Sequence, residues 1–177
     1  MRQRIWQFLH TLNASLSMED RCFVATYLPS ELQKFFWGMS VVDQCHALRV
    51  ARTAIQLARK NNFDGKLDEG LLIRGSLLHD IGRQKGDMSI MGKVLSVLCY
   101  AAFPRQSIRW ATAGDAYWFA GLRHILYISS SHPALGAQWL RQAGFAREAV
   151  LVAGHHKAPA ESDSPELLLL RAADAMN

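Results

Sequence analysis

The sequence predicts an all-α fold, and three observations support this class. Apolar residues recur at helical spacing through most of the chain, whereas the alternating pattern of half-buried strands is nearly absent. Residues that cap helix starts precede many of the apolar runs. Half of the 177 residues are hydrophobic and a fifth are charged, a balance that provides enough apolar surface for a globular core.

Start signals are frequent along the chain. Ser17 with Asp20, and Ser40 with Asp43, resemble N-caps followed by an acidic residue in the first turn. Ser30 before Glu31 is a similar start, and Ser164-Pro165-Glu166 places proline at the first helical position. The helices are expected near residues 2–13, 18–27, 31–38, 41–60, 68–80, 88–102, 120–130, 133–143, 146–156 and 165–176.

The breaks between these helices are short. Glycine, asparagine or proline marks most of them, and neither a long polar linker nor an internal repeat is present. We therefore expect one domain over residues 1–177, with N-terminal helices in 1–40 and the functional core in 41–177. Within that core, 88–122 is an apolar and aromatic insertion that matches no motif. Core or lid packing is the favoured interpretation of this insertion, and a membrane-surface helix is the alternative.

Composition excludes several classes of protein. The net charge of +5 suits an anionic substrate. Because the chain has no run of Lys and Arg, a nucleic-acid polymer is not an expected partner. The longest uncharged apolar run, 94–104, is too short to span a bilayer. The N-terminus does not resemble a signal peptide, and the three cysteines form no CxxC pair, so we expect a cytoplasmic protein.

The first candidate metal ligands are the adjacent residues His79 and Asp80, which follow an apolar helix and precede Ile81-Gly82. Neighbouring helical residues point about 100° apart, so two adjacent ligands can flank one ion at a helix end. The alternative is a polar helix C-terminus closed by Gly82. His46 lies on an apolar helical stripe and therefore faces inward, either as a ligand or as a hydrogen-bonded core histidine.

Asp174 favours the metal interpretation over these alternatives. It shares a stripe with Leu167 and Leu170 in the last helix. A carboxylate facing the core costs several kcal/mol unless a cation or good hydrogen bonds compensate for lost water. A metal ion is the strongest compensation, and Arg171 or Arg74 is the alternative partner. His46, His79, Asp80 and Asp174 would together suit Mn, Fe, Co, Ni or Zn.

A second group of histidines follows further along the chain. Pro133 fits the first position of a helix, which would leave His132 near the N-cap. The pair His155-His156 closes the helix before Lys157-Ala158-Pro159. Helix ends also favour such polar residues without any metal.

The order His46, His79-Asp80, Asp174 resembles the HD superfamily of metal-dependent phosphohydrolases. His79-Asp80-Ile81-Gly82 looks like its HDIG subgroup. The added His132-Pro133 and His155-His156 are similar to the two-metal branch, which includes HD-GYP proteins and diadenosine-polyphosphate hydrolases. The resemblance covers about residues 43–177. It implies a helical bundle with a central site for one or two divalent ions, and hydrolysis of a phosphoester or phosphoanhydride.

On this resemblance, His46, His79, Asp80 and Asp174 would hold one ion. Asp80 would bridge to a second ion held by His132 and by His155 or His156. Asp80, His132 and His156 are the candidate catalytic residues, and Arg83 and Lys85 in the following loop are candidates for binding substrate phosphate. The expected substrate is a nucleotide or a related small phosphate.

One feature limits the range of expected substrates. Lys157-Ala158-Pro159 replaces the Gly-Tyr-Pro block of the cyclic-diguanylate enzymes, which argues against that substrate. The alternative function is a catalytically silent module that binds a metal or nucleotide and signals through a partner.

Overall fold

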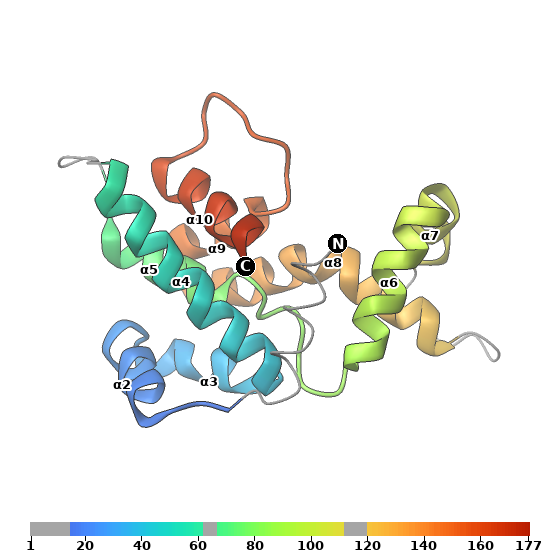
Figure 1. Ribbon diagram of the computed structural model, residues 1–177, viewed down its shortest axis with the longest axis horizontal. Coiled ribbons are helices and arrows are strands. Elements are labelled where there is room, and N and C mark those ends of the chain that lie inside the picture. Colours follow the sequence, from blue (N-terminus) through green and yellow to red (C-terminus); the bar gives the residue numbers. More distant parts are fainter. Residues whose placement is uncertain (1–14, 62–66, 112–119) are drawn as a thin grey trace.

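The computed structural model describes residues 15–61, 67–111 and 120–177 (Figure 1). Within these ranges the chain is helical and has no strand, which confirms the all-α class. The helix expected near 2–13 lies outside the described residues. The described helices are α2 (Met18–Tyr27), α3 (Ser30–Gly38), α4 (Val41–Asn61), α5 (Glu69–Leu78), α6 (Ile90–Ala102), α7 (Pro104–Trp110), α8 (Ala120–Gln142), α9 (Ala146–Gly154) and α10 (Pro165–Met176).

Most of the expected helix starts are confirmed. Ser17 caps α2, and its capping box with Asp20 is complete. The backbone N–H of Asp43 donates to the Ser40 hydroxyl in the first turn of α4. Ser164 caps α10, with Pro165 in the first turn. The expected cap at Ser30 is wrong, because α3 starts one residue earlier with Pro29 as its N-cap.

Helix α5 lies at the centre of the bundle. Its residues 71–78 are buried except for Arg74, because the segment is apolar on nearly every side and has no polar face to turn to water. It packs against α2, α3, α4, α9 and α10. Gly75 lets α9 approach, since a Cβ at this position would lie 2.5 Å from a methyl carbon of Leu151. The end of α5, where His79-Asp80 follows, is thereby placed inside the molecule.

Helix α8 corrects one sequence prediction. A break was expected before Pro133, but the helix runs without interruption from Ala120 to Gln142 with the proline inside it. Proline removes the hydrogen bond to the carbonyl four residues earlier, here Ser129. The ring of His132 donates to that carbonyl instead, from Nδ1 at 2.9 Å. This replacement is the physical reason why the helix continues.

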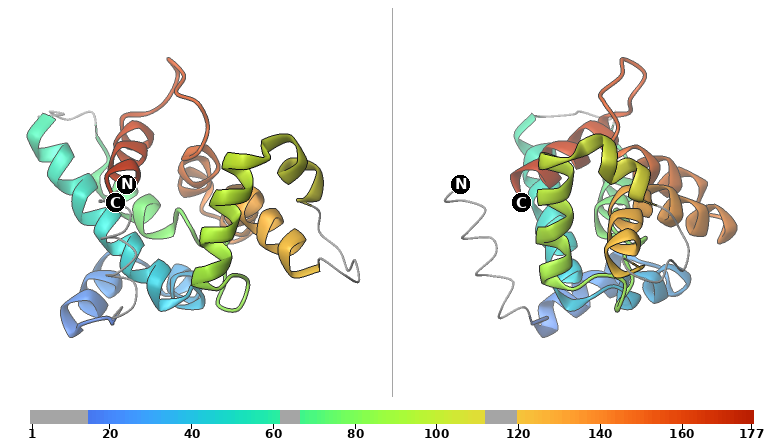
Figure 2. Two further views of the ribbon diagram at one scale, coloured as in Figure 1. Left: turned by 45° about the vertical axis from the view of Figure 1, so that its right-hand side comes forward. Right: turned by 90° about the vertical axis from the view of Figure 1, so that its right-hand side faces the viewer.

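The apolar segment after residue 88 forms two helices, whereas the sequence predicted only the first. The second, α7, begins at Pro104, the residue that was expected to end helical structure. Figures 1 and 2 place both helices against the first half of α8, at one end of the molecule. The Tyr100 hydroxyl donates to the carbonyl of Leu126, and Lys93 pairs with Asp43 of α4.

Much of the apolar surface of these two helices is not core. Large exposed side chains on them are Met91, Val94, Leu95, Val97, Leu98, Phe103, Ile108 and Trp110. Core packing was therefore the wrong expectation for these side chains. That they cover the site stays a prediction. Within the described ranges, no helix combines the length and the apolar character that a bilayer crossing requires.

Candidate metal centre

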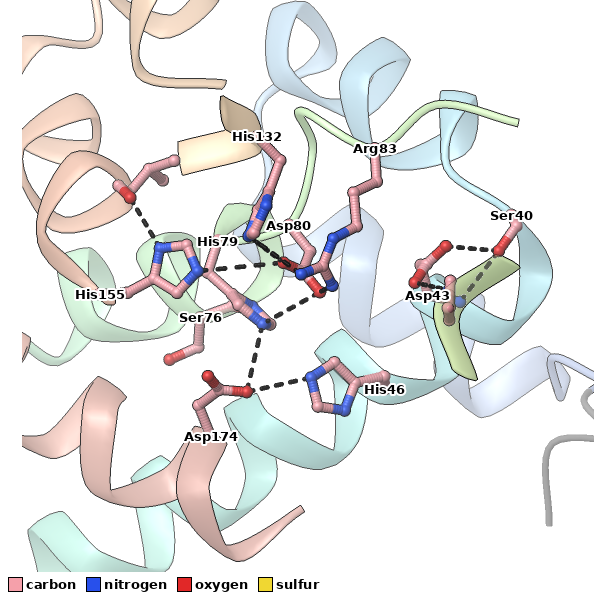
Figure 3. Close-up of polar contacts among 12 residues, drawn as sticks. Ser40, Asp43, His46, Ser76, His79, Asp80, Arg83, His132, His155 and Asp174 are labelled. Atoms are coloured by element: carbon pink, nitrogen blue, oxygen red, sulfur yellow. Dashed lines mark hydrogen bonds and ion pairs between the residues drawn. The ribbon is translucent and has the colours of Figure 1, made fainter. Parts of the chain in front are cut away.

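The side chains of all seven predicted metal ligands lie close together, although they come from helices far apart in the sequence; Figure 3 labels all of them except His156. His46 lies on α4, His132 on α8 and Asp174 on α10, while His79-Asp80 and His155-His156 directly follow α5 and α9. Figure 3 shows His79, His132, His155 and Arg83 around Asp80, with Asp174 joined to both His46 and His79.

The first group consists of His46, His79 and Asp174, whose ligand atoms all lie within 4.8 Å of one another. Asp174 Oδ1 lies 3.1 Å from His46 Nε2 and 3.6 Å from His79 Nε2. Asp80 Oδ2 completes this side, at 3.6 Å from the same His79 nitrogen. Two imidazoles and two carboxylates therefore face one another.

The second group consists of His132, His155 and His156, again with ligand atoms within 4.8 Å of one another. Asp80 Oδ1 faces this group, at 3.2 Å from His132 Nε2 and 3.9 Å from His155 Nε2. Asp80 thus directs one oxygen toward each group, which is the geometry expected of a bridging carboxylate. His132 and His155 are buried, and His156 is exposed at the rim.

Three of the histidine rings have the same orientation, with Nδ1 turned to a backbone carbonyl of their own helix. His79 Nδ1 lies 2.9 Å from the Ser76 oxygen, and His155 Nδ1 lies 2.7 Å from the Val152 oxygen. Both carbonyls belong to the last turn of a helix, where backbone partners run out. His132 uses the carbonyl that Pro133 leaves free.

This arrangement determines which ring nitrogen can bind a metal. A carbonyl only accepts hydrogen bonds, so Nδ1 of each of these rings carries a proton. The Nε2 atoms then point into the centre as the available ligand atoms. The local sequence explains the arrangement, because the end of α5, the end of α9 and Pro133 each supply an unpaired carbonyl.

Asp174 is not compensated by the arginines considered as alternatives. Arg74 pairs with Glu148 at 2.7 Å. Arg171 donates to Asp163 and twice to the carbonyl of Gly154, at 3.0 and 2.8 Å. Gly154 directly precedes His155, so Arg171 braces the turn that carries both histidines. Sequence reasoning missed this role, since nothing in the sequence links α10 with the end of α9.

Gly82 allows the turn that carries Asp80 to lie directly against the backbone of α8 at His132. A Cβ on this residue would lie 2.1 Å from the carbonyl oxygen of His132, which no side chain can tolerate. Gly136, one helical turn further along α8, also faces this contact, since its Cβ would lie 3.2 Å from Gly82 N. The glycine after His79-Asp80-Ile81 thus allows the backbone of α8 to touch the turn that carries Asp80.

The pKa values show where charge resides when no ion is bound. Burial would lower the pKa of His79, but Asp80 and Asp174 outweigh it and raise this pKa to about 9. Burial would raise the pKa of Asp80, but Arg83 and His79 hold it well below its ordinary value. Burial lowers the pKa of His132 and His155, which keeps both rings neutral near pH 7. A proton on His79 therefore compensates the carboxylates, and binding a cation would release it.

Three buried ligand atoms without partners in the described ranges are further evidence that these residues suit a transition-metal ion. His79 Nε2, Asp80 Oδ1 and His155 Nε2 are buried and have no hydrogen-bond partner within the described part of the chain. Unpaired buried polar atoms are costly, and they are rare in folded proteins. Here they converge, so a cation coordinated by them would remove that cost. Neutral imidazole and carboxylate ligands suit the metals expected from the sequence.

The two predicted substrate-binding residues differ in their placement. The Arg83 guanidinium donates to Asp80 Oδ2 at 2.6 Å and lies beside the His132 ring. Lys85 is exposed, and its backbone N–H donates to the carbonyl of Gly38. Arg83 thus contacts two of the proposed metal ligands, Asp80 and His132, whereas the side chain of Lys85 is exposed to solvent.

Comparison with known protein families gives one match, which covers part of the chain. Residues 44–98 match the HD domain, a family of mostly metal-dependent hydrolases. The matched segment contains His46, His79, Asp80 and Arg83, and ends before the remaining ligands. Neither the curated proteins nor the solved structures gave a match. The matched segment covers most of α4, all of α5, the turn that presents His79-Asp80 and the first part of α6, so this part of the chain is similar to an HD domain.

Proposed function

We propose that this protein hydrolyses a phosphoester or phosphoanhydride bond of a nucleotide or a related small phosphate. The reaction takes place at the two ligand groups around Asp80. The observation that carries the proposal is the convergence of imidazole and carboxylate atoms from α4, α8, α10 and the turns after α5 and α9. Three of these atoms, His79 Nε2, Asp80 Oδ1 and His155 Nε2, are buried without a hydrogen-bond partner in the described residues. A purely structural centre would pair these atoms with each other or with the backbone.

His46, His79, Asp80 and Asp174 would hold one divalent ion, and Asp80, His132, His155 and His156 are the ligands available to another. One or two ions of Mn, Fe, Co, Ni or Zn would activate a water molecule and neutralise phosphate charge. Asp80 is suited to hold both groups in register, because one of its oxygens faces each of them. The HDIG subgroup and a single domain over residues 1–177 are part of the same proposal.

The chain's own residues would supply orientation and proton transfer. His156 is exposed at the rim, yet its ring packs on His155 at 4.0 Å between centroids, and the loss of water lowers its pKa. A neutral imidazole in this position can accept a proton from water or pass one to a leaving oxygen. Arg83 and Lys85 would bind the substrate phosphate, Arg83 from beside Asp80 and Lys85 from the same loop.

The test combines metal analysis with a broad phosphate panel. The purified protein is assayed with added Mn²⁺, Co²⁺ or Ni²⁺ against mononucleotides, dinucleotides, cyclic dinucleotides and an activated phosphoester. Turnover is expected for at least one of these substrates, and Asp80→Asn, His46→Gln and Asp174→Asn should each remove most of it. The lost rate has a physical reason, since each change removes a ligand or a charge from the centre.

His124→Gln is the matched control, because His124 is half exposed and pairs with Asp87 rather than with a proposed ligand. This variant should retain full activity and metal content. No turnover above a blank that holds only the metal salt, in protein shown to be fully metallated, would contradict the proposal. That outcome would favour the silent binding module instead.

A further inference from the structure

Arg83 contacts two of the atoms that the proposed metal centre uses. Its Nη1 donates to Asp80 Oδ2 at 2.6 Å, and its Nη2 lies 3.1 Å from His132 Nε2 (Figure 3). Because His132 Nδ1 is protonated and donates to backbone carbonyls, Nε2 has a free lone pair. The guanidinium therefore donates into the lone pair that a metal ion at the second group would need.

The two ligand groups differ in this respect. The carboxylate of Asp174 faces His46 and His79, and the alternative arginines are engaged elsewhere. Arg83 also donates to Asp80 Oδ2, on the side of the first group. A carboxylate oxygen has a second lone pair, so a cation can enter the first group while Arg83 stays in place. At the second group, an entering cation must take His132 Nε2 from Arg83 and remain beside a fixed positive charge, which repels it.

The guanidinium is also well suited to act as a permanent cation there. Arginine keeps its charge at every physiological pH, and its planar fork can donate to two acceptors at once. Its side chain is 21% exposed, and the partner carboxylate of Asp80 is 2% exposed. A charge-assisted contact of this kind is stronger than one in water, because the surrounding dielectric is low.

We propose that Arg83 is the built-in cation of the second ligand group, so that the resting protein binds one divalent ion tightly at His46, His79, Asp80 and Asp174. A second ion binds only by displacing Arg83. This inference rests on the metal centre of the proposed function and specifies how many ions that centre holds. Displaced Arg83 would be free to contact the substrate phosphate, which links its two proposed roles.

The experiment is a titration of chelator-treated protein with Mn²⁺ in the absence of substrate. Bound ion is counted after equilibrium dialysis, and electron paramagnetic resonance distinguishes isolated ions from coupled pairs. Wild type should bind one tight ion per chain with the spectrum of isolated Mn²⁺. Arg83→Gln should bind a second ion roughly 10- to 150-fold more tightly than wild type, the factor for losing one charge-assisted hydrogen bond. The second ion should give a coupled spectrum.

Two further variants separate the contact from the loss of charge. Arg147→Gln removes the same charge from an exposed pair with Asp68 and should leave the second-ion affinity unchanged. Arg83→Lys keeps the charge but cannot donate to both acceptors, so it should fall between wild type and Arg83→Gln. If Arg83→Gln does not fold, Arg83→Lys still tests the inference.

Two results would overturn the inference. Two ions of equal affinity in wild type, or the same second-ion affinity in wild type and in a folded Arg83 variant, would contradict it. Turnover is measured on the same samples. Ion counts that follow the expected pattern without turnover would contradict the proposed function and leave the inference standing.

Discussion

At the scale of single residues, the centre depends on how each imidazole is held. Nδ1 of His79, His132 and His155 donates to a carbonyl that helix hydrogen bonding leaves free. Such contacts fix the tautomer and the ring orientation before any ion arrives. Gly82 acts at the same scale, because it lets the backbone after Asp80 reach the backbone of His132.

Gly82→Ala should be destabilising and should weaken ion binding at the second group. The new methyl group would lie 2.1 Å from the His132 carbonyl oxygen, so α8 or the turn must move. Overpacking of this kind costs about 1–3 kcal/mol. Thermal unfolding and metal analysis measure the two effects. Gly121→Ala is the control, since a Cβ there meets nothing within 4 Å and alanine favours a helix. Equal stability of Gly82→Ala and wild type would contradict the close approach.

At the scale of elements, α8 shows a conflict between helix stability and ligand orientation. Proline inside a helix costs roughly 3 kcal/mol relative to alanine. It persists here at a position where the missing hydrogen bond frees the Ser129 carbonyl for His132. The helix therefore loses stability where the site gains a fixed ligand.

Pro133→Ala should separate these two effects. The free energy of unfolding should rise by about 1–2 kcal/mol, because the helix regains a backbone bond while the unfolded chain gains some freedom. Ion affinity at the second group should fall by roughly 10- to 100-fold, because the new N–H competes with His132 for Ser129. Denaturant unfolding and metal titration test both.

Pro165→Ala is the matched control, because proline in the first turn of α10 sacrifices no helical hydrogen bond. This variant should not be more stable than wild type. Unchanged ion affinity in Pro133→Ala would show that His132 does not depend on the freed carbonyl.

The capping box of α2 gives a pH-dependent prediction. Burial would raise the pKa of Asp20, but hydrogen bonds from the backbone and side chain of Ser17 and from Arg52 lower it below its ordinary 3.8. A depressed pKa means that the stabilisation is present above pH 3.8 and is lost as the pH falls through the lowered value. Asp20→Asn should therefore lower stability at neutral pH by about 0.5–1 kcal/mol, discounted because Arg52 is 42% exposed.

The measurement compares melting temperatures of wild type and Asp20→Asn from pH 7 down to pH 2. The difference should be constant at neutral pH and should shrink below pH 4. Glu19→Gln removes a charge from the same turn, outside the capping box, and serves as the control. A difference between wild type and Asp20→Asn that does not change with pH would contradict the assignment.

At the scale of the whole molecule, the centre ties together helices that are distant in the chain. Its proposed ligands span residues 46–174 and join α4, α5, α8, α9 and α10. The unfolded chain cannot assemble such a set, so ion binding adds to folding stability. Helices α6 and α7, which carry many exposed apolar side chains, pack against α8.

A chelator should therefore lower the melting temperature of wild type. An ion present at a thousand times its dissociation constant contributes about 4 kcal/mol, which corresponds to roughly 10 °C in a chain of this size. The double variant His79→Ala with Asp80→Ala should be nearly insensitive to chelator, and His124→Gln should respond as wild type does. Equal sensitivity of the double variant and wild type would argue against a metal site.

Much of the fold and the ligand set could be predicted from the sequence. Helical periodicity and capping residues are local signals, so α2, α4 and α10 begin where they were expected. The positions of His46, His79-Asp80 and Asp174 on apolar stripes or helix ends indicated a buried polar cluster. Local signals failed where tertiary contacts decided the outcome, as at Pro133 and Pro104, since a proline rule cannot include the ring of His132 or the packing of α7.

The sequence by itself determined the fold class, the residues with ligand chemistry and the order in which they occur. These depend on residue type and on spacing within a single helix. The tertiary structure alone decided that His46 and His79 compensate Asp174 while Arg171 and Arg74 do not. It also decided that Arg83 lies against Asp80 and His132. The physical reason is that electrostatic partnership depends on distance in space, and helices that are far apart in the chain set that distance only when they pack.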